Sequence, residues 1–271
     1  MTTATAPRRA THVASPYRLN FIRLLRSEWI KLSTLRSTWW SIGLTAVITI
    51  GIALLVAASM GDVPGFQAIQ AVVSPIQFTM LLAGILGAIA VTGEYSTGMI
   101  LSTLAAEPVR GAVLAAKAVV VALVMFVSSL VIFGGAALVV TPIFAGRDIA
   151  FGWDDPTAST LPILMASVSM AAFALIGLAF GFLLRSGAGA IASTVGLLFV
   201  LPIIANIFGV VGEGWEWIAT VAEHLPMAAA QSLILPQDDW GLPVAEAALT
   251  LGAWVAAGLI GAWGVLRSRD A

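Results

Sequence analysis

The chain has 271 residues, of which 59% are hydrophobic and only 10% are charged. Soluble domains carry roughly 25% charged residues, so this composition excludes an ordinary soluble fold. The sequence has no cysteine, which excludes disulfides, thiolate metal sites and a cysteine nucleophile. The formal net charge of −1 gives no reason to expect a nucleic-acid partner, and none is expected.

The N-terminal region divides into a tail and an arm. Residues 1–16 lack periodicity and are expected to be disordered. Residues 17–38 are expected to form a basic amphipathic helix on the cytoplasmic membrane surface. Arg26 and Lys31 lie on its polar face, whereas Glu28 falls within the apolar arc, where a carboxylate needs a cationic or hydrogen-bonding partner. A simple membrane anchor is the alternative. The apolar arc consists of Tyr17, Phe21, Leu24, Leu25, Trp29, Leu32 and Leu35.

Residues 39–271 are expected to form a six-helix transmembrane domain. About 20 apolar residues cross the hydrocarbon core as a helix, and these runs are too long for barrel strands. The predicted fold is therefore an all-α integral membrane protein, with six spans preceded by an amphipathic interfacial helix. The spans are placed near 39–60, 71–92, 114–140, 160–184, 188–210 and 245–266.

The basic residues predict the orientation of these spans. Twelve of the 13 Lys and Arg residues fall on one side of the predicted bundle, and only Arg147 falls on the other. Because positive residues are enriched on the cytoplasmic side, both termini are expected to be cytoplasmic. A signal peptide is not expected, because residues 1–38 precede the first apolar run and five more spans follow it.

The connection between the second and third spans, GEYSTGMILSTLAAEPVRGAVLAAKA (93–118), is longer than a simple turn requires. Glu94 and Tyr95 end the second span, Gly98 provides a flexible joint, and Met99–Leu104 is expected to form a short amphipathic helix. Arg110 leads into the third span. A short helix with charges at both ends is a docking surface for a cytoplasmic partner; an ordinary interfacial loop is the alternative.

This connection and the arm LLRSEWIKLSTLRSTWW resemble the permease subunits of ABC-2 type transporters, especially those of high-GC Gram-positive bacteria. The resemblance implies a type-2 ABC exporter-like fold in the bacterial cell membrane and a second permease subunit, identical or different. It also implies that the arm is a connecting helix, with Arg26, Glu28 and Lys31, and that the second-to-third connection is a coupling helix. Both would contact a separate ATP-binding cassette ATPase subunit.

The sequence lacks motifs that would indicate nucleotide binding, metal binding or catalysis. It has no phosphate-binding G-x-x-x-x-G-K-[ST] loop, so ATP and Mg are expected on the partner subunit and no cofactor on this chain. His12 and His224 lack metal-ligand spacing, and no G-x-S-x-G motif occurs. The chain is therefore not expected to be an enzyme.

The leading functional hypothesis is ATP-driven export of an amphiphilic or hydrophobic compound, such as a drug, a peptide or a lipid. The spans carry no mid-helix charge, which fits such a cargo better than an ion. Phe78 and Asn206 are the candidate lining residues of the translocation path; for Asn206, an interhelical hydrogen bond near Pro202 is the alternative. A non-transporting membrane scaffold or regulatory protein remains the second hypothesis. A channel is weaker, because no charged ring or polar filter appears.

Overall fold

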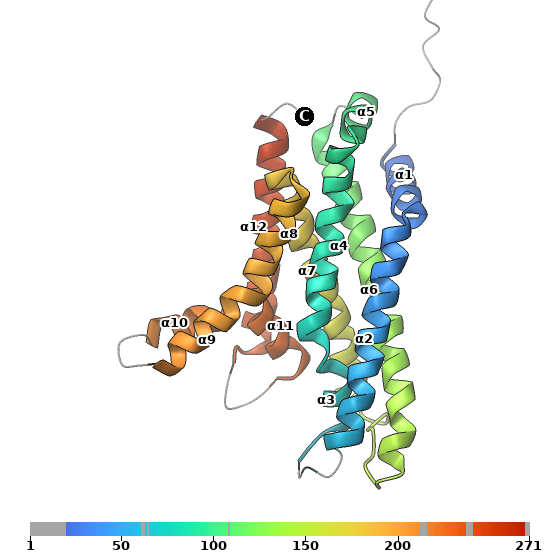
Figure 1. The fold of residues 1–271 in the computed structure, drawn as a ribbon, viewed down its shortest axis with the longest axis vertical. Coiled ribbons are helices and arrows are strands. Elements are labelled where there is room, and N and C mark those ends of the chain that lie inside the picture. Colours follow the sequence, from blue (N-terminus) through green and yellow to red (C-terminus); the bar gives the residue numbers. More distant parts are fainter. Residues whose placement is uncertain are drawn as a thin grey trace, which may run out of the picture.

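The computed structural model describes residues 20–60, 63, 65–107, 109–211, 216–236 and 241–268. These ranges contain helices and no strand, which confirms the all-α prediction (Figure 1). The expected disordered tail, residues 1–16, lies outside the described residues.

Six helical segments are long and apolar enough to cross a membrane, so the chain is a multi-pass helical membrane protein. The fourth has the predicted bounds. The third is longer than predicted: α6 has 36 residues and is about 54 Å long, well beyond a hydrocarbon core of about 30 Å. The six segments are Arg36–Ser59, Ala68–Ser96, Arg110–Ala145, Thr160–Leu184, Gly187–Phe208 and Val244–Ser268.

The second span is broken near its start into α3 (Ala68–Val73) and α4 (Ile76–Ser96). Pro75 lies at the break; it has no N–H to donate and its ring restricts the preceding residue. Ser74 ends the shorter helix by donating its N–H to the Gln70 carbonyl at 3.0 Å. The span therefore enters the bundle as two helices that lie end to end.

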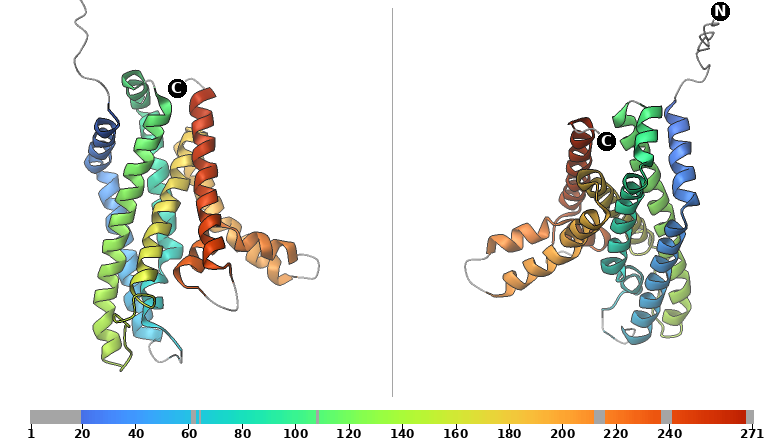
Figure 2. Two further views of the ribbon diagram at one scale, coloured as in Figure 1. Left: turned by 180° about the vertical axis from the view of Figure 1, so that it is seen from behind. Right: turned by 45° about the horizontal axis from the view of Figure 1, so that its top comes forward.

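The fifth span bends away from the bundle. It consists of α8 (Gly187–Val195), a π-helical turn (Gly196–Val200) and α9 (Leu201–Val211). A π-turn and a nearby proline, here Pro202, are established causes of a helix bend. In Figures 1 and 2, α9 projects sideways and lies beside α10 (Glu216–Glu223).

The arm is shorter than the predicted 17–38 helix. Helix α1 (Phe21–Thr34) ends where Leu35 takes an extended conformation, and α2 (Arg36–Met60) begins at the next residue. Residues 17–19 lie outside the described part of the chain. Leu24, Glu28 and Leu32 form the buried face of α1, whereas Phe21 and Trp29 of the predicted apolar arc are exposed. The amphipathic surface helix therefore stays a prediction.

Helices α4 and α7 (Thr160–Leu184) cross in close contact at the centre of the bundle. Small residues permit the close approach. A Cβ built on Gly177 would lie 1.9 Å from the Gly84 carbonyl oxygen, and one on Gly87 would lie 1.9 Å from that of Ala174. Gly177 and the glycine four residues later, Gly181, thus serve packing within one chain.

Gly177→Ala is expected to destabilise the protein by about 1–3 kcal/mol, because the added methyl group meets backbone that cannot move aside easily. The matched control is Gly134→Ala in α6, where an added Cβ meets nothing within 4 Å. That control is expected to be neutral or to stabilise the helix by about 0.5–1 kcal/mol. Unfolding of the purified protein in detergent, followed by tryptophan fluorescence, measures both; equal effects would contradict the close crossing.

One end of the bundle carries α1, α5 (Met99–Ala106) and the end of α12 (Val244–Ser268) (Figures 1 and 2). We call it the basic end, because most described basic residues lie on its segments. Arg147 lies elsewhere and has a structural role: its guanidinium donates to the carbonyls of Ala57 at 2.7 Å and Ala58 at 2.9 Å. A cation near the last carbonyls of a helix, here α2, is favourable, which explains this exception to the charge bias.

The predicted orientation can be tested with single cysteines, since the natural chain has none. Ser102→Cys in α5 and Ala158→Cys in the α6–α7 connection both occupy exposed positions. If the basic end is cytoplasmic, an impermeant thiol reagent on intact cells labels residue 158 and spares residue 102 until the cells are opened. The opposite pattern would reverse the orientation. Ser159 is unsuitable, because it is fully buried.

Candidate functional site

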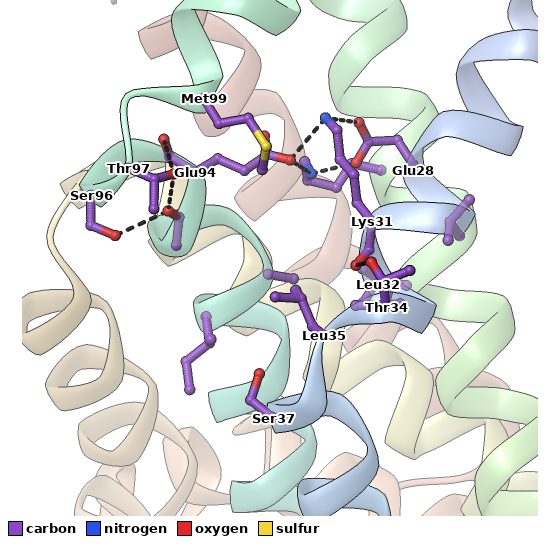
Figure 3. Close-up of a pocket in the computed structure, with 16 residues that line it drawn as sticks. Glu28, Lys31, Leu32, Thr34, Leu35, Ser37, Glu94, Ser96, Thr97 and Met99 are labelled. Carbon is purple, nitrogen blue, oxygen red and sulfur yellow. Dashed lines mark hydrogen bonds and ion pairs between the residues drawn. The ribbon is translucent and has the colours of Figure 1, made fainter.

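Four charged side chains from three helices meet at the basic end: Glu28 and Lys31 of α1, Glu94 of α4 and Lys117 of α6. We call them the charged cluster (Figure 3). The Lys31 ammonium lies 2.7 Å from Glu28 Oε1 and 2.9 Å from Glu94 Oε1. The Lys117 ammonium lies 2.8 Å from Glu94 Oε1 and also binds Glu28 Oε2. Each lysine thus bridges both carboxylates.

The cluster is buried and electrically balanced. The side chains of Glu28, Glu94 and Lys117 are at most 4% exposed, and that of Lys31 is 20% exposed. Charges so far from water are tolerated only when they are paired and hydrogen-bonded. Two carboxylates and two ammonium groups cancel, so Glu28 has the cationic partners that its place in the apolar arc requires.

The cations of the cluster are the only two lysines of the chain; all its other basic residues are arginines. An ammonium group carries three donors on one compact atom, so it fits between two converging carboxylates, whereas a guanidinium is a wide planar fork. Burial lowers the pKa of Lys31, but the hydrogen bonds and charges of Glu28 and Glu94 outweigh it and raise the pKa above its ordinary value. Lys31 therefore stays charged in the cluster.

Helix α5 is tied to the cluster through Thr103. Gly98 adopts a left-handed conformation (φ 70°) that ends α4 and starts α5, a geometry that glycine adopts without strain. The Thr103 hydroxyl accepts a hydrogen bond from the Lys31 ammonium at 3.1 Å. Leu104 packs against the buried Leu24 of α1 and Val113 of α6. The short helix is thus attached to both α1 and α6.

Tyr95 and Arg110 lie apart from the cluster, although the sequence groups them with Glu94. The Tyr95 ring makes an edge contact with Phe182 of α7, at 6.5 Å between centroids, and the Arg185 guanidinium lies 5.4 Å from its centroid. Arg110 donates to the Leu266 carbonyl near the end of α12. Both side chains therefore connect helices at the basic end.

A cavity of about 390 Å³ adjoins the cluster between α1, α4 and α6. Met99 of α5 lies at its wall, as do the four charged residues (Figure 3). Glu94 Oε2 is buried without a hydrogen-bond partner among the described residues. Arg26, the remaining residue predicted for the connecting helix, is exposed.

The two candidate path residues are not part of this site. Phe78 lies near the start of α4 with 51% of its surface exposed. Asn206 lies on the projecting α9, and its amide donates to the Pro202 carbonyl of the same helix at 2.8 Å. Four residues separate donor and acceptor, so this bond stays within one helical turn, and an interhelical bond of Asn206 stays a prediction.

Sequence reasoning missed Lys117 and Thr103 as members of the site. Lys117 lies two turns inside α6, within the third span and not in the connection before it. A signal was present: a lysine within an otherwise uncharged apolar run requires a carboxylate, and Glu94 ends the preceding span. Thr103 gives no comparable signal, because threonines are common on exposed helix faces.

Within the described residues, no group of three His, Asp or Glu side chains is placed to hold a metal ion. The cluster instead provides paired charges that lock three helices and a short fourth one together. Comparison with models of known protein families gives no match, and neither does comparison with curated protein sequences.

Proposed function

We propose that this chain is the permease subunit of an ATP-driven exporter of the ABC-2 type. It works with a second permease subunit and a separate ATP-binding cassette ATPase subunit, which holds ATP and Mg. The cargo is an amphiphilic or hydrophobic compound, and the basic end faces the cytoplasm. The family is proposed because the arm and the second-to-third connection resemble those of ABC-2 type permeases in sequence.

The observation that carries the proposal is the charged cluster. The two segments expected to contact the ATPase, α1 and α5, are bonded through it to the spans α4 and α6. A loop that only connects two spans needs no such buried network. A segment that receives force from a partner needs such a network, because a loosely attached helix would be displaced without moving the spans.

The contacts give a route for that force. A displacement of α1 or α5 moves Lys31, and with it both carboxylates of the cluster. Glu94 is on α4, and the backbone of α4 lies in close contact with that of α7 where Gly84 meets Gly177. Close-packed helices transmit displacement because the contact cannot be compressed. Movement at the basic end thus reaches the centre of the bundle.

Affinity purification tests the proposal. The tagged chain, extracted from its native membrane in a mild detergent, is expected to retain an ATP-binding cassette subunit, identified by mass spectrometry. The complex is expected to hydrolyse ATP, and the chain alone is not. Purification of the chain with a different cytoplasmic protein and no ATPase activity would favour the scaffold hypothesis and reject the exporter.

A further inference from the structure

A second cavity, of about 320 Å³, lies away from the charged cluster, where the broken second span faces α11 (Pro226–Ile234). The segments that form it, α3, the start of α4 and α11, lie in the lower part of Figure 1, toward the end opposite α5. Its volume is within the range of small-molecule sites, roughly 300–1,000 Å³. The proposed coupling function does not use it.

Three glutamines from three different helices converge on this cavity: Gln70 of α3, Gln77 of α4 and Gln231 of α11. The chain brings them together because the break at Pro75 separates α3 from α4, while α11 packs against α7 and α12 and leaves Gln231 facing the break. All three glutamines are half-buried, so a molecule that enters the cavity can reach their amides.

The amides have unused hydrogen-bonding capacity. Gln70 Oε1 accepts only a long bond, 3.4 Å, from the Gln67 N–H. The side chains of Gln77 and Gln231 have no hydrogen-bond partner within the described part of the chain. Each amide can donate two hydrogen bonds and accept others, so together they can satisfy a head group that has both donors and acceptors.

The rest of the wall is uncharged and, apart from Ser74, whose hydroxyl donates to the Ala71 carbonyl, apolar. Val73, Ile76 and Ile234 are buried beside the amides, and no charged side chain is among the described lining residues. A carboxylate, phosphate or ammonium group would enter without a counter-charge, at a large desolvation cost. A neutral hydroxyl or amide head group with a hydrocarbon body fits both the amides and the aliphatic wall.

We propose that this cavity binds a neutral amphiphile, whose hydroxyl or amide head bonds Gln70, Gln77 and Gln231 and whose hydrocarbon part lies against Val73 and Ile234. Only the further statement that this ligand is the transported cargo rests on the function proposed above. Binding itself requires neither the ATPase nor ATP.

Photo-crosslinking of the isolated chain in lipid nanodiscs tests the site. The probe is a monoacylglycerol with a diazirine in its acyl chain, used below saturation, and crosslinked peptides are located by mass spectrometry. We expect crosslinks to residues 70–77 and 231–235 that an excess of unlabelled monoacylglycerol suppresses. An alkyl sulfate and an alkyl trimethylammonium of equal chain length are expected not to suppress them.

Gln77→Leu and Gln231→Leu keep the side-chain size and remove the hydrogen bonds, so each is expected to reduce the suppressible labelling about tenfold. The control is Ser102→Leu, a change of an exposed polar residue of α5 outside the cavity lining, which is expected to leave labelling unchanged. Labelling that is insensitive to both cavity variants, or suppressed equally by the charged compounds, would overturn the proposal. Since no ATPase is present, that failure is separate from failure of the exporter function, which the copurification experiment detects.

Discussion

Lys117→Met is expected to destabilise the folded protein by about 3–5 kcal/mol. Methionine keeps the length of the side chain but removes the ammonium group, which binds Glu28 and lies 2.8 Å from Glu94. Two buried carboxylates would then share Lys31 alone, and one negative charge would remain uncompensated away from water. Unfolding in detergent with increasing denaturant, followed by tryptophan fluorescence, measures the loss.

A double variant separates charge imbalance from lost packing. Glu28→Gln together with Lys117→Met leaves one carboxylate and one ammonium, so much of the lost stability is expected to return. Arg26→Met on the exposed side of α1 is the matched control and is expected to change stability by less than about 0.5 kcal/mol. If the double variant is as unstable as the sum of its single changes, the cluster does not act as one network.

Composition and apolar run length were enough to predict the spans. The fourth span has the predicted bounds because charged residues or caps enclose a single apolar run, Thr160–Leu184. The third was placed too short, at 114–140, because charged residues lie near its start, yet a helix continues through a charge such as Lys117 that has a buried partner. Charge alone therefore marks a helix end only when the charge is solvated.

The breaks in the second and fifth spans depend on tertiary structure that hydropathy does not report. Pro75 and Pro202 both lie inside apolar runs, where proline can kink a helix, end it or be absorbed by a wide turn. One separates α3 from α4, whereas the other follows the π-helical turn and lies within α9. Which outcome occurs depends on how the neighbouring helices pack around the proline, and the hydropathy of the segment does not report that packing.

The sequence predicts that Glu28 needs a cationic partner, but it does not predict which residue provides the charge. A carboxylate at position 28 within an apolar arc requires a cation, and the sequence supports no more than that requirement. The pairing of Glu28 with Lys117 joins residues 89 apart in the chain, and it exists only because α1 lies against α6. Helix periodicity places a residue on a face, whereas the identity of the facing helix comes from the packed bundle.

Leu101→Asp is expected to abolish transport and cargo-stimulated ATP hydrolysis in the proposed complex of this chain with an ATPase subunit. Leu101 is 56% exposed on α5, the helix proposed to dock on the ATPase, so replacing it removes no buried side chain from the isolated chain. At an apolar docking site the same carboxylate would be buried without a partner. A loss of at least about 2 kcal/mol in docking lowers the affinity roughly thirtyfold.

The Leu101→Asp substitution separates an effect on docking from an effect on folding. Substitutions of Glu94 and Arg110 cannot separate the two effects, because those side chains bond to α1 and α12 inside the chain. Unfolding of the isolated Leu101→Asp protein should match that of the natural protein, while copurified ATPase and vesicle transport fall together. The control Val63→Asp makes the same change at an exposed residue of the α2–α3 connection, remote from α5, and should leave both unchanged. Transport at the natural rate by the Leu101→Asp variant would mean that α5 is an ordinary connection, and the charged cluster would then be a structural lock without a coupling role.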